Sequence, residues 1–192
     1  MNASSKPRLK LLALAALFLA PFVGALLLYY VFPEYIPESR PSYGTLVSPL
    51  RAAPDLALAD AAGVATPTAL LGKWSLVYLG RPTCTEACAA RLMVTRQVRL
   101  ALGKSRERVQ RVYLAPDAAA ATAVKAQLGA EHHDLIVLVA GSAAAQFFQP
   151  TDPDALYLVD PLGNLTMLYT GAIEHKGLYR DIKKLLRVSR AG

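Results

Sequence analysis

The chain has 192 residues, a formal net charge of +7, and 54% hydrophobic residues. Setting aside the first fifty or so residues leaves roughly 140, which predicts one folded domain of ordinary size and excludes a long array of domains. The hydrophobic fraction is high for a wholly soluble protein, so the excess must be concentrated in one segment.

That segment lies near the N-terminus, because no charged residue occurs in the range 11–32. A helix of this length reaches about 33 Å and crosses a hydrocarbon core of about 30 Å. Basic residues precede it (Lys6, Arg8, Lys10) and acidic residues follow it (Glu34, Glu38). The positive-inside rule therefore places residues 1–10 in the cytoplasm and the remainder outside, in the periplasm if the membrane is the inner membrane of a bacterium.

A cleaved signal peptide is the alternative interpretation of this segment, because a basic start and an apolar run are common to both. The apolar run continues past the small residues Gly24 and Ala25, which is longer than a signal peptide requires and favours a retained transmembrane helix.

Residues 33–54 contain five prolines and show no apolar periodicity, so we expect an extended spacer. The prolines are Pro33, Pro37, Pro41, Pro49 and Pro54. The folded domain is then predicted to occupy residues 55–190.

Strand and helix patterns alternate through this domain. A short strand and turn are expected at 56–63 and a helical turn at 68–71, and then four strands at 74–79, 109–114, 135–140 and 156–159, with a last strand at 165–169. Helices are expected from Ala87 to Leu102 and at 117–128, 143–148 and 178–188. This order predicts an α/β domain of the thioredoxin-like class, with a mixed sheet and helices on both faces.

The two cysteines of the chain, Cys84 and Cys88, lie between the first of these four strands and the following helix. A thiol at a helix N-terminus meets unpaired N–H groups and the positive end of the dipole, which favour the thiolate. The spacing allows the pair to share a metal or, if the first turn is not fully helical, to form a disulfide. A purely structural disulfide is the third interpretation, although so small a loop adds little stability.

The sequence resembles the Sco (SenC/PrrC) family, membrane-anchored copper chaperones that help to build the copper centre of cytochrome c oxidase. The motifs that carry the resemblance are 72–78, the cysteine segment 84–88 and the later segment 156–163. The resemblance implies that both cysteines bind copper, that a loop histidine completes the site, and that an oxidase subunit or another assembly factor is the partner.

This chain departs from the family pattern at three positions. Asp152 stands near the place of the expected histidine, Ala89 replaces the proline after the second cysteine, and only Glu86 can replace the aspartate of the cysteine loop. Because Cu(I) prefers thiolate or imidazole donors, the missing histidine favours a redox dithiol over a complete copper site. Pro150 and Pro153 are candidates for a loop proline facing the cysteines.

The remaining histidines, His132, His133 and His175, are expected to be solvated loop residues, and Met93 and Met167 core residues. Basic residues gather at 91–111 and predict a solvated face or, alternatively, a surface for anionic lipid or an acidic protein. Nucleic acid is not expected as a partner, because no recognised binding motif occurs.

The sequence thus leaves three functions open. The first is a Sco-like assembly factor for the copper centre of cytochrome c oxidase, acting through its dithiol as reductant and as copper chaperone. The second is a general membrane-tethered periplasmic thiol–disulfide oxidoreductase, in which Cys84 attacks and Cys88 resolves. The third is a non-catalytic thioredoxin-like docking protein.

Overall fold

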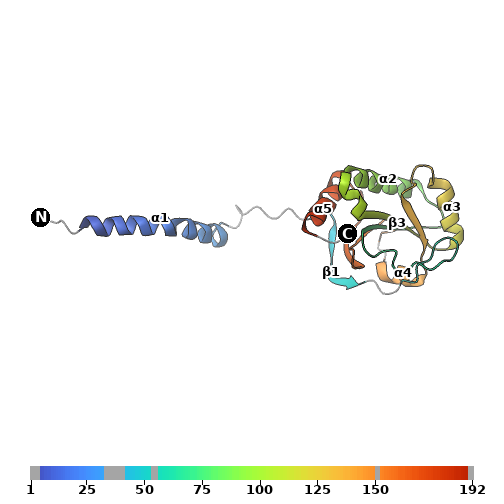
Figure 1. Cartoon of the computed structure of the whole chain (residues 1–192), viewed down its shortest axis with the longest axis horizontal. Coiled ribbons are helices and arrows are strands. Elements are labelled where there is room, and N and C mark those ends of the chain that lie inside the picture. Colours follow the sequence, from blue (N-terminus) through green and yellow to red (C-terminus); the bar gives the residue numbers. More distant parts are fainter. Residues whose placement is uncertain (1–4, 33–41, 53–55, 150–151, 190–192) are drawn as a thin grey trace. The chain divides into compact units, whose positions relative to one another are not determined.

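The computed structural model describes residues 5–32, 42–52, 56–149 and 152–189. They form two separate units, residues 1–41 and 42–192 (Figure 1). Within the first unit, α1 (Ser5–Tyr30) contains a stretch, Leu9–Leu28, that is long and apolar enough to cross a membrane. None of this stretch is buried, as expected of a helix whose apolar surface faces lipid. It overlaps the predicted span 11–32.

The second unit is built on one six-stranded sheet in the order β1-β6-β5-β2-β3-β4. The strands are β1 (Thr45–Ala52), β2 (Trp74–Leu79), β3 (Val109–Ala115), β4 (Leu135–Val139), β5 (Leu156–Val159) and β6 (Asn164–Tyr169). The helices are α2 (Glu86–Ala101), η2 (Gly103–Arg108), α3 (Ala118–Leu128), α4 (Ser142–Phe148) and α5 (His175–Val188). This confirms the predicted alternation and the mixed sheet.

Strands β2, β3 and β4 are parallel, whereas β5 and β6 run antiparallel to their neighbours. The parallel strands β2 and β3 are largely buried because helices or chain segments cover both of their faces, whereas the edge strand β4 is only partly buried. The tight turn between β5 and β6 contains Gly163 at a φ of +88°, a conformation that glycine adopts without a Cβ clash. The predicted hairpin at Gly163 is therefore confirmed.

Two hydrophobic cores lie on opposite faces of the sheet. One face packs against α2, α3 and α5 and includes both cysteines. The other face packs against α4 and the segment that carries Leu56, Leu58 and Leu70. Figure 1 shows α2 and α4 on opposite sides of the strands. Because the cysteine turn joins the end of central strand β2 to α2, it lies at the carboxyl ends of the parallel strands.

The predicted spacer 33–54 is wrong for its last part, where Thr45–Ala52 forms the edge strand β1. Proline is accepted in an edge strand because one side of the strand needs no hydrogen-bond donor. Pro49 need not donate a ladder hydrogen bond, because it lies within the register shift between Leu46 and Arg51. The folded unit accordingly begins at Ser42 rather than at residue 55; residues 33–41 lie outside the described part of the chain.

Two further local predictions differ from the structure. The segment expected as a strand at 56–60 forms only isolated bridges, from Ala59 to Ala65 and to Val139. The residues after α2 form the helical turn η2, which the sequence analysis did not predict. Gly103 follows α2 at a φ of +58°, consistent with the helix end expected there.

Candidate functional site: the cysteine turn

Cys84 and Cys88 form a disulfide at the start of α2, with their Cα atoms 5.3 Å apart. The bond is possible because the helix begins only at Glu86, so that Cys84 precedes the helix and Cys88 lies in its first turn. Both side chains are buried, Cys84 at 6% exposure and Cys88 at 3%. The condition stated for a disulfide, an incompletely helical first turn, is therefore met.

Thr85, between the cysteines, is the N-cap of α2. Its hydroxyl oxygen accepts a hydrogen bond from the backbone N–H of Cys88 at 3.3 Å. This satisfies one of the amide donors that a helix N-terminus leaves without a helical partner. The cap fixes where the helix starts, and thereby leaves Cys84 in the loop and Cys88 in the helix.

Hydrogen bonds to backbone carbonyls hold the loop before the helix. Gln127 of α3 donates to the carbonyl of Cys84 at 3.1 Å. Tyr113 of β3 donates its hydroxyl to the carbonyl of Arg81 at 2.9 Å. The Tyr113 ring lies directly against Gly80, where a Cβ would overlap it, so glycine is required at the end of β2.

A second tyrosine ties the cysteine turn to the loop before β5. Tyr78 is paired in register with Tyr113, with ring centroids 5.6 Å apart, and donates its hydroxyl to Asp154 at 2.7 Å. Burial, and then the hydrogen bond to Asp154, raise the pKa of Tyr78 above its ordinary range. Arg81 also reaches the Asp154 carboxylate, at 3.3 Å. Tyr113 thus holds the loop that leads to Cys84, and Tyr78 together with Arg81 holds the loop before β5.

Asp152, the residue near the place of the family's histidine, has other partners. Its carboxylate accepts hydrogen bonds from the backbone N–H groups of Asp154 and Gly171, both at 2.9 Å, and these lower the pKa of Asp152. Arg91 of α2 donates to the carbonyl of the same Gly171 at 2.7 Å. The loop that carries Asp152 is therefore linked to α2, but through backbone groups rather than through a ligand shared with the cysteines.

The donor set does not fit a three-ligand copper site. Among the described residues, no group of three or more His, Cys, Asp or Glu side chains is arranged to hold a metal ion. Of the two candidate loop prolines, Pro150 lies outside the described residues and Pro153 is exposed beside Asp152. Cys84 and Cys88 come together as predicted.

The prediction that His132 is a solvated loop residue is wrong. Its side chain is 4% exposed, and its Nδ1 lies 3.0 Å from Nη2 of Arg111, which is itself 1% exposed. Burial, together with the nearby arginine charge, lowers the pKa of His132. His133 is exposed, and His175 is half-buried with its ring stacked on Tyr179. Met167 is a core residue as predicted, whereas Met93 is only partly buried.

The basic segment 91–111 is not a uniformly solvated face. Arg111 forms an ion pair with Asp134 at 2.8 Å, and Arg99 reaches the same carboxylate at 3.1 Å. Arg108 donates to the carbonyls of Leu186 and Ser189 at the end of α5. Several of the arginines that suggested a surface for lipid or an acidic partner therefore hold the domain's own elements together.

Sequence reasoning missed the residues that support the turn, namely Tyr78, Tyr113, Arg81, Asp154 and Gln127. The sequence offered one signal for the two tyrosines: Tyr78 and Tyr113 each precede the last residue of a run predicted as a strand, and so lie near the cysteine turn. The sequence offered no signal for Gln127, because the position of α3 against the cysteine loop is set by tertiary packing.

Comparisons with known proteins agree with this architecture. The family model described as "Transmembrane-like, thioredoxin-like, C-terminal domain" matches residues 74–189. Comparison with curated proteins gives no match.

Three solved structures show the same fold. Apo Sco1 from Thermus thermophilus is 21% identical, with a TM-score of 0.63 over 77% of this chain and 99% of that chain. Yeast Sco1 with copper bound is 20% identical, with a TM-score of 0.59 over 78% and 96%. A putative thioredoxin from Neisseria meningitidis is 18% identical, with a TM-score of 0.51 over 78% and 93%. The Sco resemblance seen in the sequence is confirmed at the level of fold.

Proposed function

The chain belongs to the family of the transmembrane-like, thioredoxin-like, C-terminal domain, and on this premise we propose that it is a membrane-tethered thiol–disulfide exchange protein. The observation that carries the proposal is the disulfide between Cys84, in the loop, and Cys88, in the first turn of α2. The tether is α1, with the domain in the periplasm as the charge asymmetry around α1 predicts.

Cys84 is assigned as the attacking residue and Cys88 as the resolving one. Cys84 precedes the N-cap and is the more exposed of the two cysteines, at 6% against 3%, whereas Cys88 lies in the first turn of the helix. In the dithiol form, the positive end of α2 stabilises a thiolate at this turn. The neutral hydrogen bonds from Gln127 and Tyr113 keep the loop in place while the sulfur reacts.

The exchange balances as two successive displacements. The Cys84 thiolate attacks one sulfur of a partner disulfide, the partner S–S bond breaks, and a mixed disulfide forms while one partner thiolate leaves. The Cys88 thiolate then attacks the Cys84 sulfur, which releases the second partner thiolate and forms the Cys84–Cys88 disulfide. Two electrons pass to the partner, and an upstream protein dithiol must restore the reduced form.

The acceptor we propose is the cysteine pair of an oxidase copper centre, or an assembly factor that serves it. The support is the sequence resemblance to the Sco family together with the shared fold. A copper-delivery role has weaker support, because the described residues supply two thiolates and no third donor. The chain is accordingly assigned as a reductant.

Trapping experiments with the full-length chain in phospholipid vesicles test the cysteine roles. The two substrates are glutathione disulfide and the oxidised copper-centre domain of the same organism's oxidase subunit. Cys88→Ser should accumulate a mixed disulfide through Cys84, and Cys84→Ser should accumulate none. Equal trapping by both variants would contradict the assigned roles, and failure of the wild-type dithiol to reduce either substrate would overturn the function.

The same experiment separates an oxidase-specific reductant from a general oxidoreductase. Reduction of the oxidase domain at least tenfold faster than reduction of glutathione disulfide supports the specific acceptor. Equal rates favour the general thiol–disulfide oxidoreductase.

A further inference from the structure

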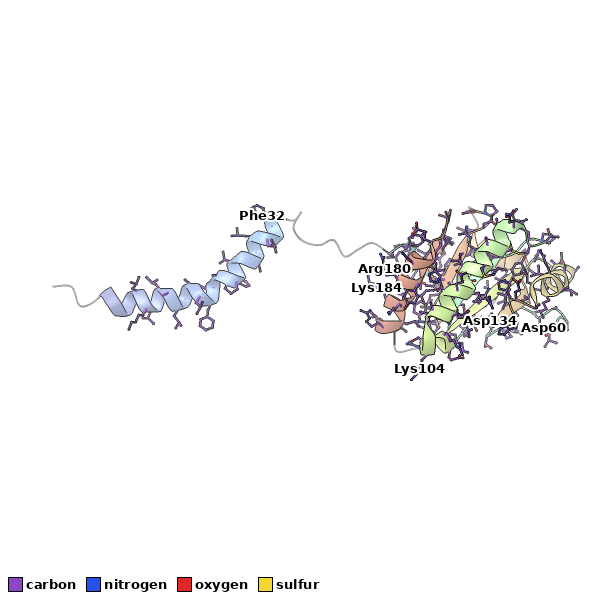
Figure 2. All side chains as sticks on the ribbon, turned by 90° about the horizontal axis from the view of Figure 1, so that it is seen from above. Phe32, Asp60, Lys104, Asp134, Arg180 and Lys184 are labelled. Carbon is purple, nitrogen blue, oxygen red and sulfur yellow. A yellow bond between two sulfur atoms is a disulfide. The ribbon has the colours of Figure 1, made fainter. Side chains whose placement is uncertain are left out.

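The outward face of α5 carries five exposed basic residues, defined here as the α5 basic face: Lys176, Arg180, Lys183, Lys184 and Arg187. Figure 2 shows Arg180 and Lys184 together at one outer edge of the folded domain. Among the described residues, none of the five takes part in an ion pair shorter than 4.0 Å. This face therefore presents cations that the rest of the domain does not neutralise.

The single acidic residue of α5, Asp181, points away from this face. It is 5% exposed, and its carboxylate accepts hydrogen bonds from the backbone N–H of Gly44 at 2.9 Å and from the Tyr169 hydroxyl at 3.4 Å. The helix thus separates its charges, with the acid buried and the bases outside.

Through its hydrogen bond to Gly44, Asp181 also holds the segment at which the chain enters the domain, and Tyr43 adds further contacts. The Tyr43 hydroxyl donates to the carbonyl of Ala172 and accepts from the N–H of Glu174, at 2.8 and 2.7 Å. The Tyr43 ring lies so close to Gly177 that a Cβ there would overlap it. Residues 43 and 44 are therefore fastened to α5 itself.

This attachment limits the distance between α5 and the membrane. The residues between Tyr30, where α1 ends, and Ser42 can span at most about 40 Å even when fully extended. Because the chain enters the domain beside α5, the tether keeps the α5 basic face at high effective concentration near the bilayer surface.

The composition of the face suits a lipid surface. Tyr179 is half-buried between the cations, and Lys183 Nζ lies 5.3 Å from the centroid of its ring. Val188, at the end of α5, is 80% exposed. Basic residues beside an aromatic ring and an exposed aliphatic side chain are typical of helices that lie on anionic membranes.

We propose that the α5 basic face binds anionic lipid headgroups of the membrane in which α1 is anchored, and so holds the folded domain against the bilayer. The proposal rests on α1 being a retained anchor, as in the proposed function, but not on the chemistry of the cysteines. Each cation near an anionic surface strengthens binding about fivefold, so three act together by about a hundredfold.

The test uses the full-length chain with the Cys84–Cys88 disulfide intact and a fluorophore on an introduced cysteine, Val188→Cys. Two vesicle types are compared, phosphatidylcholine alone and phosphatidylcholine with phosphatidylglycerol in equal amounts, each with a trace of headgroup-nitroxide lipid as quencher. Flotation of the vesicles first shows that the chain is inserted, which separates failure of the anchor from failure of this proposal. A second label, Val64→Cys, reports on the segment that covers the opposite face of the sheet.

We expect the Val188 label to be quenched at least twofold more in the phosphatidylglycerol vesicles, with the difference lost in high salt. The Val64 label should show no such difference. Arg180→Gln combined with Lys183→Gln and Lys184→Gln should abolish the effect, while the matched variant Lys73→Gln, Lys104→Gln and Lys125→Gln, all at exposed residues, should retain it.

Equal quenching in the two vesicle types, or equal loss in the two triple variants, would overturn the proposal. It is also overturned if the α5 variant keeps its lipid quenching but no longer co-purifies with an acidic membrane protein, because the surface then serves a protein partner. Replacement of both Cys84 and Cys88 with serine, which leaves the introduced cysteine as the labelled thiol, should keep the lipid contact unchanged whatever the effect on thiol exchange.

Discussion

The two ends of α2 are held in different ways. At its N-terminal end, the Cys84–Cys88 turn is fixed by neutral hydrogen bonds: Gln127 and Tyr113 donate to loop carbonyls, and the cap Thr85 accepts from the Cys88 N–H. From its middle onward, α2 is held by charged groups: Arg111, 1% exposed, donates to the Leu92 carbonyl at 2.8 Å and to Asp134 and His132, and Arg99 in the last turn pairs with Asp134.

This difference suits a redox site on a fixed support. A neutral hydrogen bond to a carbonyl can survive a change at the neighbouring sulfur, whereas a buried guanidinium cannot lose its carboxylate without leaving a charge uncompensated. Burial lowers the pKa of Arg111 to about 10, which still leaves it charged at neutral pH. The charged cluster therefore anchors α2 while the opposite end of the helix changes its bonding.

The largest effect on stability is expected from removing the ion pairs that hold the charged end of α2. Asp134→Ala removes the carboxylate shared by Arg111 and Arg99 and should lower the free energy of unfolding by about 3–5 kcal/mol, because a buried cation loses its partner. Chemical denaturation of the full chain in detergent measures this. Glu107→Ala is the control, since it breaks the exposed pair with Arg106 and should change stability by less than about 1 kcal/mol. Equal losses in the two variants would contradict the role assigned to Asp134.

A smaller effect is expected at the cysteine end. Tyr113→Phe removes the hydroxyl that holds the Arg81 carbonyl and should cost about 1 kcal/mol. It should also change the rate at which the dithiol reduces glutathione disulfide, because the loop before Cys84 loses a support. Tyr157→Phe is the matched control, because the Tyr157 hydroxyl is buried with no hydrogen-bond partner among the described residues. If Tyr157→Phe proves as costly as Tyr113→Phe, the hydrogen bond is not the cause.

The smallest effect is expected on the slope of folding stability against pH. Burial, and then the charges of Arg111 and Arg96, lower the pKa of His132 in the folded protein against the opposing Glu131 and Asp134, whereas the unfolded side chain binds a proton near about pH 6.5. Stability present at neutral pH is therefore lost as the pH falls below about 6.5 toward the lowered pKa.

His132→Asn should flatten this slope, because asparagine keeps an acceptor for Arg111 but does not titrate in this range. Unfolding midpoints measured between pH 7 and pH 5 provide the readout, with the exposed His133→Asn as control. Equal flattening by both variants would exclude the buried histidine as the source.

The sequence predicted the central part of the fold closely. The runs Trp74–Leu79 and Leu156–Val159 form strands with the predicted bounds, because apolar runs this short, bounded by turn residues, are typical of buried strands. The edge strand β1 was missed because Pro49 hides its strand pattern, although an edge strand tolerates a proline. Likewise, nothing local distinguishes His132, which is buried, from His133, which is exposed.

By itself, the sequence determined an apolar N-terminal helix, an α/β domain of the thioredoxin-like class and a cysteine pair at a strand-to-helix turn, since each depends on residues close together in the chain. Only the tertiary structure decided that the Asp152 carboxylate accepts a hydrogen bond from the distant Gly171 N–H, and that the arginines of segment 91–111 divide between buried and exposed sites. These depend on which distant segments meet across the sheet, and local pattern does not encode that.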